Sequence, residues 1–296
     1  MKPKVSIIIL NWNGLNDTRE CLESLKKIDY PNYEIIIIDN GSTDGSADKI
    51  RKEFPYVKLT MNSENLGFAE GNNIGIREAL KGEPDYILLL NNDVVVEKNF
   101  LNELVKVFES DPKIGMASPK IYYYDKPNII WFAGAKFDRY SGTSPHTGRQ
   151  KVDKGQYDGT RKCDRLSGAC MLIKRAVIEK IGYLNEDYFR AAEDTEYSIR
   201  ARKSGYEILF VPSSIIRHKV SSATGGEDSA QNIYYSNRNT MYLINEYYKY
   251  TLPLVLIRYY FKYLFMLVSG RKEKANATHD AISDFTAKKK GRSEKY

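Results

Sequence analysis

The chain has 296 residues, 42% hydrophobic and 28% charged, which suits one large α/β domain with an additional segment and excludes a disordered or fibrous protein. Its three cysteines are too few for a disulfide framework and indicate a reducing, cytoplasmic compartment. Residues 236–296 hold 12 Lys+Arg and 5 Asp+Glu, which accounts for the whole net charge of +7, because residues 1–235 hold 33 of each. A basic excess confined to one segment favours a membrane surface over nucleic acid, and no nucleic-acid recognition motif occurs in the rest.

Strands and helices alternate along the first 90 residues. Continuous apolar runs at residues 5–10, 33–38 and 86–90 predict strands that are covered on both faces. Residues 46–53 and 72–80 are among the helical patterns between them. This alternation predicts βαβ units, and therefore an α/β fold with a Rossmann-like, mostly parallel sheet flanked by helices. The first apolar run is too short for a signal peptide, so we expect the N-terminus to belong to the fold.

Polar side chains follow three of these strands, at residues 11–13, 39–42 and 91–93. Ligands of such sheets bind beyond the carboxyl ends of the strands, so these clusters should share one ligand-binding rim. The first turn lacks G-x-G-x-x-G, and no G-x-x-x-x-G-K-[ST] occurs, which disfavours a dinucleotide dehydrogenase and a P-loop NTPase. The sequence therefore predicts a nucleotide site built from side chains and a metal ion.

Eight stretches carry recognisable motifs: VSIIILNWNG (5–14), IIIIDNGSTDGS (35–46), ENLGFAEGNNIGI (64–76), ILLLNNDV (87–94), LSGACMLIKR (166–175), EDYFRAAEDTEYSIRARKSGY (186–206), VPSSIIRH (211–218) and YYSNRN (234–239). In this order they resemble the family 2 glycosyltransferases of GT-A fold, in the rhamnosyltransferase-like and galactofuranosyltransferase-like branch. The resemblance implies inverting transfer of a sugar from a nucleotide-diphosphate donor, UDP- or dTDP-linked by preference, to a hydroxyl of a glycan or lipid-linked acceptor. It also implies a divalent cation, Mg²⁺ or Mn²⁺, as cofactor.

The resemblance places nucleotide contacts along the rim. The residue that matches Asp39 contacts the base in similar enzymes, although Asn40-Gly41-Ser42 after it is also ordinary turn chemistry. The asparagines likewise either contact the nucleotide or are ordinary loop residues. The glycine-bearing stretch after residue 64 either lets the backbone approach a ligand closely or forms a tight loop and a helix start. The predicted nucleotide-binding residues are Asn11, Asn13, Asp39, Asn65, Gly67, Asn72, Asn91 and Asn92.

The predicted metal ligands are Asp93 and His218. Asn91-Asn92-Asp93 stands where the family often has Asp-x-Asp, so Asp93 matches the last carboxylate, whereas Asn91 offers only a neutral oxygen. A lone His after an apolar strand is usually structural. In similar enzymes, however, a metal-binding His follows a V-P-x-x-x-x-x-H stretch, and Val211-Pro212 with His218 fits this pattern.

The predicted catalytic residues are Asp194 and Glu193, which open a helical stretch. Acidic residues are common at helix starts because the helix dipole favours them. An inverting transfer needs one carboxylate to take the proton of the acceptor hydroxyl, and in the resembling family that carboxylate is the Asp of the E-D-x-[DE] motif, which matches Asp194. Glu193 would orient the acceptor or hold the helix start.

Four further residues are predicted to contact donor or acceptor. Gly168 and Ala169 are small residues that would let a sugar lie against the backbone. Trp131 would stack on a sugar face, with a place in the core as the alternative. Arg238 would reach a phosphate group, with a salt bridge between the C-terminal segment and the body as the alternative.

Residues 236–296 are predicted to form a helical, Tyr-rich, basic extension after a glycosyltransferase domain at residues 1–235. The largely apolar run Leu252–Val268 contains Arg258 and Lys262 and is followed by basic residues, which favours a helix that lies in the cytoplasmic face of the cell membrane. Packing on the body or on a partner in a homo-oligomer is the alternative. Two other functions stay open: a polyprenyl-phosphate sugar synthase of the same fold, and a catalytically weak binding partner in a glycan-assembly complex.

Overall fold

The computed structural model describes residues 2–220 and 228–296. The strands are β1 (Val5–Asn11), β2 (Tyr33–Asp39), β3 (Lys58–Met61), β4 (Tyr86–Asn91), β5 (Val94–Val96), β6 (Ile114–Tyr123), β7 (Lys126–Phe132), β8 (Arg161–Lys162), β9 (Cys170–Lys174) and β10 (Glu207–His218). The α-helices are α1 (Leu15–Leu25), α2 (Ser46–Glu53), α3 (Gly67–Leu80), α4 (Phe100–Lys106), α5 (Arg175–Ile181), α6 (Glu193–Lys203), α7 (Ala230–Tyr247), α8 (Leu252–Val268) and α9 (Lys272–Thr286), and two short 3-10 helices cover Val107–Glu109 and Lys249–Thr251.

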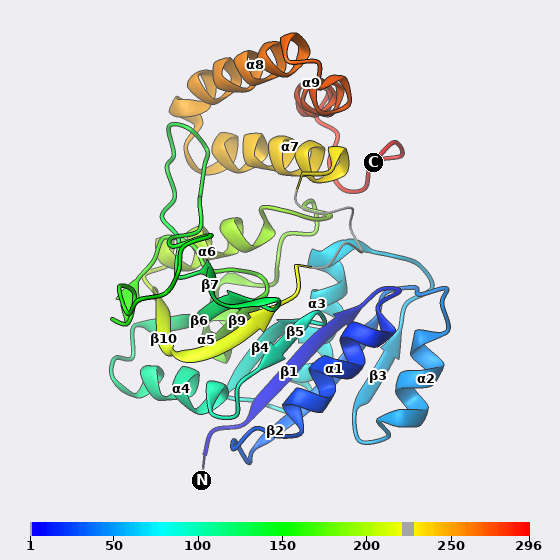
Figure 1. Cartoon of the computed structure of the whole chain (residues 1–296), viewed down its shortest axis with the longest axis vertical. Coiled ribbons are helices and arrows are strands. Elements are labelled where there is room, and N and C mark those ends of the chain that lie inside the picture. Colours follow the sequence, from blue (N-terminus) through cyan, green and yellow to red (C-terminus); the bar gives the residue numbers. More distant parts are fainter. Residues whose placement is uncertain (1, 221–227) are drawn as a thin grey trace.

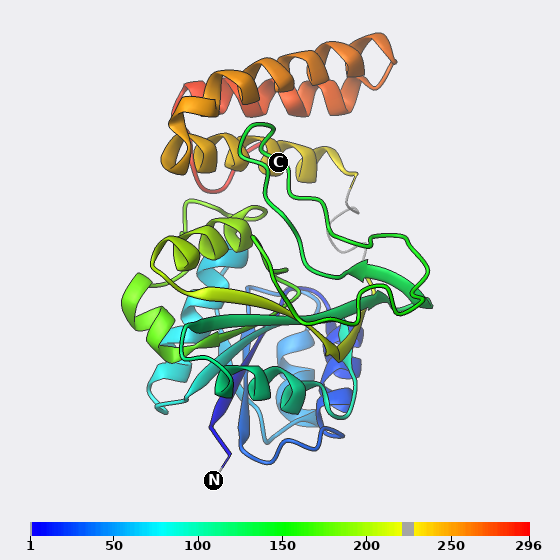
Figure 2. The ribbon, with the colours of Figure 1, turned by 90° about the vertical axis from the view of Figure 1, so that its left-hand side faces the viewer.

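In the described residues the strands form one ten-stranded sheet in the order β3-β2-β1-β4-β9-β6-β10-β5, with β7 beside β6 and β8 beside β10. Helices flank the sheet, and α7, α8 and α9 form a separate helical layer beyond one end of it (Figures 1 and 2). This arrangement confirms the α/β fold with a C-terminal helical extension.

The first half of the sheet is parallel and brings the predicted rim together. β1 pairs in parallel with both β2 and β4, and Asn11 lies opposite Asp39 where β1 and β2 end. The second half is mixed, because β9 runs antiparallel to both β4 and β6. The residue before β9, Ala169, lies at the rim, where its carbonyl accepts from the backbone amide of Asn91 at 3.0 Å. Because β9 starts at the rim, whereas β4 ends there, the two strands run in opposite directions. The parallel pairing expected for most of the sheet is therefore limited to β3-β2-β1-β4 and to β6-β10.

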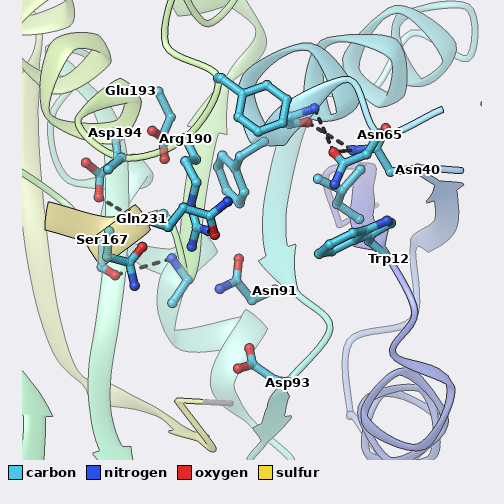
Figure 3. A pocket seen from close by; sticks show the side chains of 18 of the residues that line it. Trp12, Asn40, Asn65, Asn91, Asp93, Ser167, Arg190, Glu193, Asp194 and Gln231 are labelled. Carbon is cyan, nitrogen blue, oxygen red and sulfur yellow. Dashed lines mark hydrogen bonds between the residues drawn. The ribbon is translucent and has the colours of Figure 1, made fainter. Parts of the chain in front are cut away.

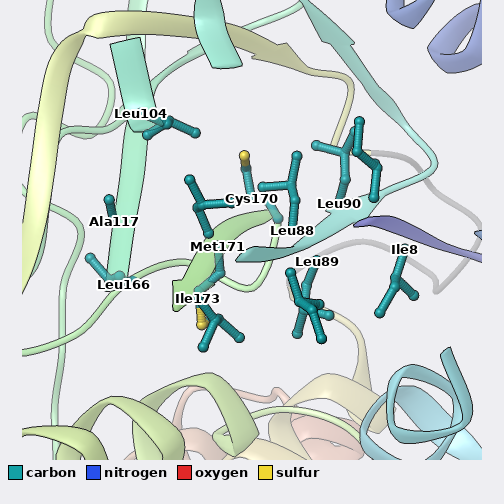
Figure 4. Close-up of a cluster of buried hydrophobic side chains, with 14 of the residues drawn as sticks. Ile8, Leu88, Leu89, Leu90, Leu104, Ala117, Leu166, Cys170, Met171 and Ile173 are labelled. Atoms are coloured by element: carbon teal, nitrogen blue, oxygen red, sulfur yellow. The ribbon is translucent and has the colours of Figure 1, made fainter. Parts of the chain in front are cut away.

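The main core lies on both faces of the central strands, where the apolar runs of β1, β4 and β9 are buried (Figure 4). Helix α3 packs close against β1 because it carries glycines at the contact. A Cβ at Gly71 would lie 2.5 Å from Leu10 Cδ1, and one at Gly75 would lie 2.4 Å from Ile8 Cγ2. These two glycines therefore serve the packing of helix on strand.

The C-terminal extension is joined to the sheet domain by a second apolar cluster. Tyr188 and Ile199 of the sheet domain pack there with Ile233, Tyr235 and other side chains of α7, α8 and α9. Helix α7 runs without a break across the domain boundary expected between residues 235 and 236. The chain after α9 then returns to the sheet domain, where the Gly291 amide donates to the Asp187 carbonyl at 3.0 Å.

Candidate active site

A cavity of about 1050 Å³ lies beyond the carboxyl ends of β1 and β4, at the predicted rim. Its walls come from distant parts of the sequence: the strand ends, the start of α3, the segments before β9 and α6, helix α7, and residues 292–296 after α9. Figure 3 shows the two sides, with Trp12, Asn40 and Asn65 across the cavity from Glu193 and Asp194. One space thus receives side chains from both halves of the sheet domain and from the extension.

The strand-end side of the cavity suits a nucleotide. Four of the predicted nucleotide-binding residues line it: Asn65, Gly67, Asn91 and Asn92. Trp12 and Asn40 also line it, and sequence reasoning missed both, although each lies beside a predicted residue. The side-chain nitrogen Nδ2 of Asn40 donates to Asn65 Oδ1 at 3.0 Å. The half-exposed indole ring of Trp12 offers a flat face on which a base can stack.

The other four predicted nucleotide-binding residues do not line the cavity: Asn11, Asp39 and Asn72 are buried behind this wall, and Asn13 is exposed beside it. The buried Asp39 carboxylate accepts from the Ser42 amide at 2.9 Å and from Asn11 Nδ2 at 2.7 Å. Asn13 Oδ1 accepts from the Thr43 amide at 2.8 Å, and Asn72 Nδ2 donates to the Phe68 carbonyl at 2.8 Å. In the structure Asp39 and Asn13 thus stabilise the turn after β2, and Asn72 bonds within α3, so the direct nucleotide contact of these residues stays a prediction.

Asp93 and His218, the predicted metal ligands, lie side by side in the cavity wall, with His218 Nε2 3.0 Å from Asp93 Oδ1. β5 and β10 pair antiparallel immediately beside them, and the Lys219 amide donates to the Asp93 carbonyl at 3.0 Å. In the described residues no group of three or more His, Cys, Asp and Glu side chains gathers in a metal-binding cluster. One carboxylate and one imidazole fit a divalent cation that takes its other ligands from water and phosphate oxygens.

Trp131 lines the cavity between two histidines. Its ring centroid lies 4.4 Å from that of His146 and 4.5 Å from that of His218, both edge-on. Burial lowers the pKa of His146 well below its usual value, so its ring is neutral near neutral pH. His146 also lines the cavity, and no sequence pattern marks it.

The Asp194 carboxylate is held in a fixed orientation at the cavity wall. Its Oδ2 accepts from Arg165 Nη1 at 3.0 Å and from the Gly168 amide at 3.1 Å, while its Oδ1 accepts from the Thr195 hydroxyl at 3.0 Å. Gly168 and Ala169 line the cavity as well, so the segment before β9 reaches it. Arg165 was not among the predicted residues.

Glu193 lies beside Asp194 and differs from it in its surroundings. Its side chain is buried, and Oε2 has no hydrogen-bond partner. Burial, and next to it the charge of Asp194, raise the pKa of Glu193 to about 8. Both causes favour the protonated form of Glu193, whose side chain lines the cavity.

Arg238 does not line the cavity, contrary to expectation. It is almost fully buried in the extension, where Nη1 donates to the Tyr234 hydroxyl at 3.0 Å and Nη2 donates to the Gly291 carbonyl at 2.6 Å. Through its bond to Gly291, Arg238 holds the segment after α9 against α7. That segment, Arg292–Tyr296, lines the cavity itself, and the Tyr296 ring stacks on that of Tyr234 with the centroids 4.4 Å apart.

The chain is similar to proteins named as glycosyltransferases. It is 26% identical to the N-acetylglucosaminyl-diphospho-decaprenol L-rhamnosyltransferase of Mycobacterium tuberculosis, over 66% of this chain and 69% of that protein. It is 28% identical to an uncharacterised protein of Sinorhizobium fredii over 77% of this chain, but the match spans only 26% of that longer protein.

Solved structures of the same fold contain nucleotide sugars. TarS of Staphylococcus aureus, in complex with UDP-GlcNAc, matches 94% of this chain and 80% of its own with a TM-score of 0.62 and 18% identity. A mannosyltransferase of Pyrobaculum calidifontis, in complex with GDP-Man and Mn²⁺, matches 97% of this chain and 88% of its own with a TM-score of 0.59 and 15% identity. The family model "Glycosyl transferase family 2" matches residues 6–182, more than half of the sequence. The chain belongs to this family of glycosyltransferases.

Proposed function

We propose that this glycosyltransferase moves a sugar from a nucleotide-diphosphate donor to a hydroxyl group of a glycan or lipid-linked acceptor, with inversion at the anomeric carbon and with a divalent cation. A UDP- or dTDP-linked donor is favoured. The observation that carries the proposal is that one cavity holds a nucleotide-type wall, the Asp93–His218 pair and the Asp194 carboxylate. These are the three parts that such a transfer needs.

The donor's nucleotide would lie on the strand-end side. Trp12 would stack on the base, while the side chains of Asn40 and Asn65 and the backbone at Gly67 border the space for it. Asp93 and His218 would hold Mg²⁺ or Mn²⁺ beside the diphosphate, where the cation neutralises charge that develops on the leaving group. The Mn²⁺ in the similar mannosyltransferase complex supports this cofactor.

Asp194 would accept the proton of the attacking hydroxyl. An inverting transfer takes place in one displacement, so it needs one base on the acceptor side and no nucleophilic residue. The hydrogen bonds from Arg165 and the Gly168 amide fix the carboxylate plane, which is the orientation a base requires before the acceptor arrives. Protonated Glu193 would donate to an oxygen of the sugar or the acceptor.

We further propose that the protein acts at the inner face of the cell membrane. In the described residues Lys249–Val268 is long and apolar enough to cross a membrane, and 22% of this window is buried. One side of α8, with Val255 and Tyr259, packs on the protein, while Ile257, Phe261 and Phe265 on the other sides are more than half exposed. Arg258 Nη1 donates to the Ser141 carbonyl at 2.8 Å, which ties this helix to the body. A helix attached in this way suits the membrane surface better than a span.

A lipid-linked acceptor is consistent with this location, and the similar mycobacterial enzyme is named for one. The test uses purified protein with Mn²⁺, a panel of UDP-, dTDP- and GDP-sugars, and a bacterial membrane lipid extract as acceptor. We expect one donor to release its nucleoside diphosphate and to yield a glycolipid whose anomeric configuration, read by NMR, is opposite to the donor's. Retained configuration would overturn inversion, and absence of release with every donor would overturn the proposed activity.

A further inference from the structure

Two arginines line the cavity and have no role in the mechanism proposed above. Arg190 precedes α6, and Arg292 follows α9; both line the cavity, and the Arg292 guanidinium lies over the Phe189 ring, 5.9 Å from its centroid. In Figure 3 Arg190 lies on the Asp194 side of the cavity, together with Gln231 of α7. The strand-end wall with Trp12 lies across from them.

The charge of Arg190 has no carboxylate partner among residues 2–220 and 228–296. Its Nη1 donates to Gln231 Oε1, a neutral amide oxygen, at 2.7 Å. Glu193 is near enough to favour the charged form of Arg190 but forms no ion pair with it, and burial favours the protonated form of Glu193. A half-buried guanidinium without a counter-charge is costly unless a ligand supplies one.

Arg292 is the second available cation. Its one ion pair, with Glu64 at 3.5 Å, joins two exposed side chains and is therefore weak. The two other basic side chains of this wall are already engaged, since Arg165 pairs with Asp194 at 3.0 Å and Lys295 with Asp280 at 2.5 Å. Arg190 and Arg292 are thus the two arginines of the cavity wall that, in the described residues, no buried carboxylate holds in an ion pair.

We infer that Arg190 and Arg292 form a diphosphate-binding subsite for the acceptor, separate from the donor diphosphate position at Asp93 and His218. The inference rests on the proposed function and assigns the acceptor its chemical class: a sugar or lipid carried on a diphosphate. Guanidinium groups bind phosphate oxygens through paired, charge-assisted hydrogen bonds, which suits this role. Gln231 positions Arg190 by accepting a hydrogen bond from one of its N–H groups. Because Gln231 is neutral, it does not neutralise the charge of Arg190.

The experiment measures binding of farnesyl diphosphate to the full chain in saturating UDP and Mn²⁺, so that the donor position is filled. We expect wild type to bind farnesyl diphosphate and to bind farnesol at least tenfold more weakly. Arg190→Gln and Arg292→Gln should each weaken farnesyl diphosphate binding about tenfold, the usual effect of losing one charge-assisted hydrogen bond. Gln231→Glu keeps Arg190 but places a negative charge beside it, so this variant should also weaken farnesyl diphosphate binding about tenfold. Arg175→Gln, on exposed α5, is the matched control and should bind as wild type does.

The outcomes separate this inference from the proposed function. If UDP raises the melting temperature of wild type but farnesyl diphosphate binds no better than farnesol, the subsite is wrong and the glycosyltransferase proposal stands. If Arg190→Gln and Arg292→Gln lose UDP binding instead, the two arginines serve the donor diphosphate and the inference is overturned. Arg292 is exposed, so its variant should keep the wild-type melting temperature and tests the subsite even if Arg190→Gln unfolds.

Discussion

Arg165 and Asp194 form an ion pair in the cavity wall: Arg165 Nη1 donates to Asp194 Oδ2 at 3.0 Å, and both side chains are largely buried. The same oxygen accepts from the Gly168 amide at 3.1 Å. The chain segment before β9 therefore orients the proposed base from two directions. Because Gly168 also lines the cavity, a shift of this segment would move both the proposed base and the surface proposed to contact a sugar.

The first prediction concerns the base. Asp194→Asn keeps the shape of the side chain and its bond to the Gly168 amide but cannot take a proton. We expect kcat to fall by about 10²–10⁴, the usual contribution of general-base catalysis, with the donor KM nearly unchanged. Asp48→Asn, at an exposed site on α2, should keep full activity. Near-normal turnover of Asp194→Asn would point to an acceptor that needs no base, such as a phosphate.

The second prediction concerns pH and stability. The pKa of Glu193 is raised to about 8 in the folded protein, mainly by burial, whereas in the unfolded chain it returns to its usual value. Between these two values the unfolded chain gives up a proton that the folded protein keeps, so this group lowers stability as pH rises, until it ionises in both states.

Glu193→Gln removes that effect because it is neutral at every pH. We expect its melting temperature to exceed that of wild type at pH 8 and to approach it at pH 5. The exposed Glu179→Gln, on α5, should follow wild type at both pH values. A constant difference between Glu193→Gln and wild type across this range would show that Glu193 is ionised in the folded protein.

The third prediction concerns Gly67, where α3 begins at the cavity. Its φ is +85°, and a Cβ there would lie 2.4 Å from the Phe189 carbonyl oxygen, a backbone atom. We expect Gly67→Ala to lose about 2 kcal/mol of unfolding free energy, or more, from strain and the clash. Gly45→Ala is the matched control, since its φ is +74° but nothing lies within 4 Å of its Cβ; it should lose about 1 kcal/mol. Equal losses in urea unfolding would contradict the clash.

The fourth prediction concerns the exposed side of α8. Replacing Ile257 and Phe265 together by Glu should reduce binding to phosphatidylglycerol vesicles by more than about tenfold, because each apolar side chain would otherwise enter the lipid. Val152→Glu introduces a charge at a similarly exposed site of the sheet domain and should leave binding unchanged. If the double variant instead turns a dimer into a monomer and vesicle binding is unaffected, this face contacts a second copy of the chain.

The sheet could be predicted from sequence because its central strands are continuous apolar runs. A strand covered on both faces is apolar at nearly every position. β1, β2 and β4 follow this pattern, with Ser6 and Glu34 as exceptions, and end within a residue of their predicted ends. The antiparallel β9 could not be predicted, because its direction depends on where the long connection before it returns to the rim.

The candidate site was predictable where a strand end or a family motif fixes the place of a residue, as for Asn91 and Asp93. It was not predictable where packing between distant segments decides. No local sequence pattern indicates that Trp12 lines the cavity, whereas its neighbour Asn11 is buried and bonds to Asp39. Arg292 reaches the site only because the extension folds back onto the sheet domain, which no local pattern encodes.

The most direct test of the account is a thermal-shift panel with UDP, dTDP, GDP and CDP, each with and without Mn²⁺, on wild type and Asp93→Asn. Binding to the folded state raises the melting temperature by mass action. We expect one nucleotide to give a clear shift that needs Mn²⁺ in wild type and that is lost in Asp93→Asn. No shift with any nucleotide, or an equal Mn²⁺-dependent shift in Asp93→Asn, would contradict a metal-dependent nucleotide-sugar site at this cavity.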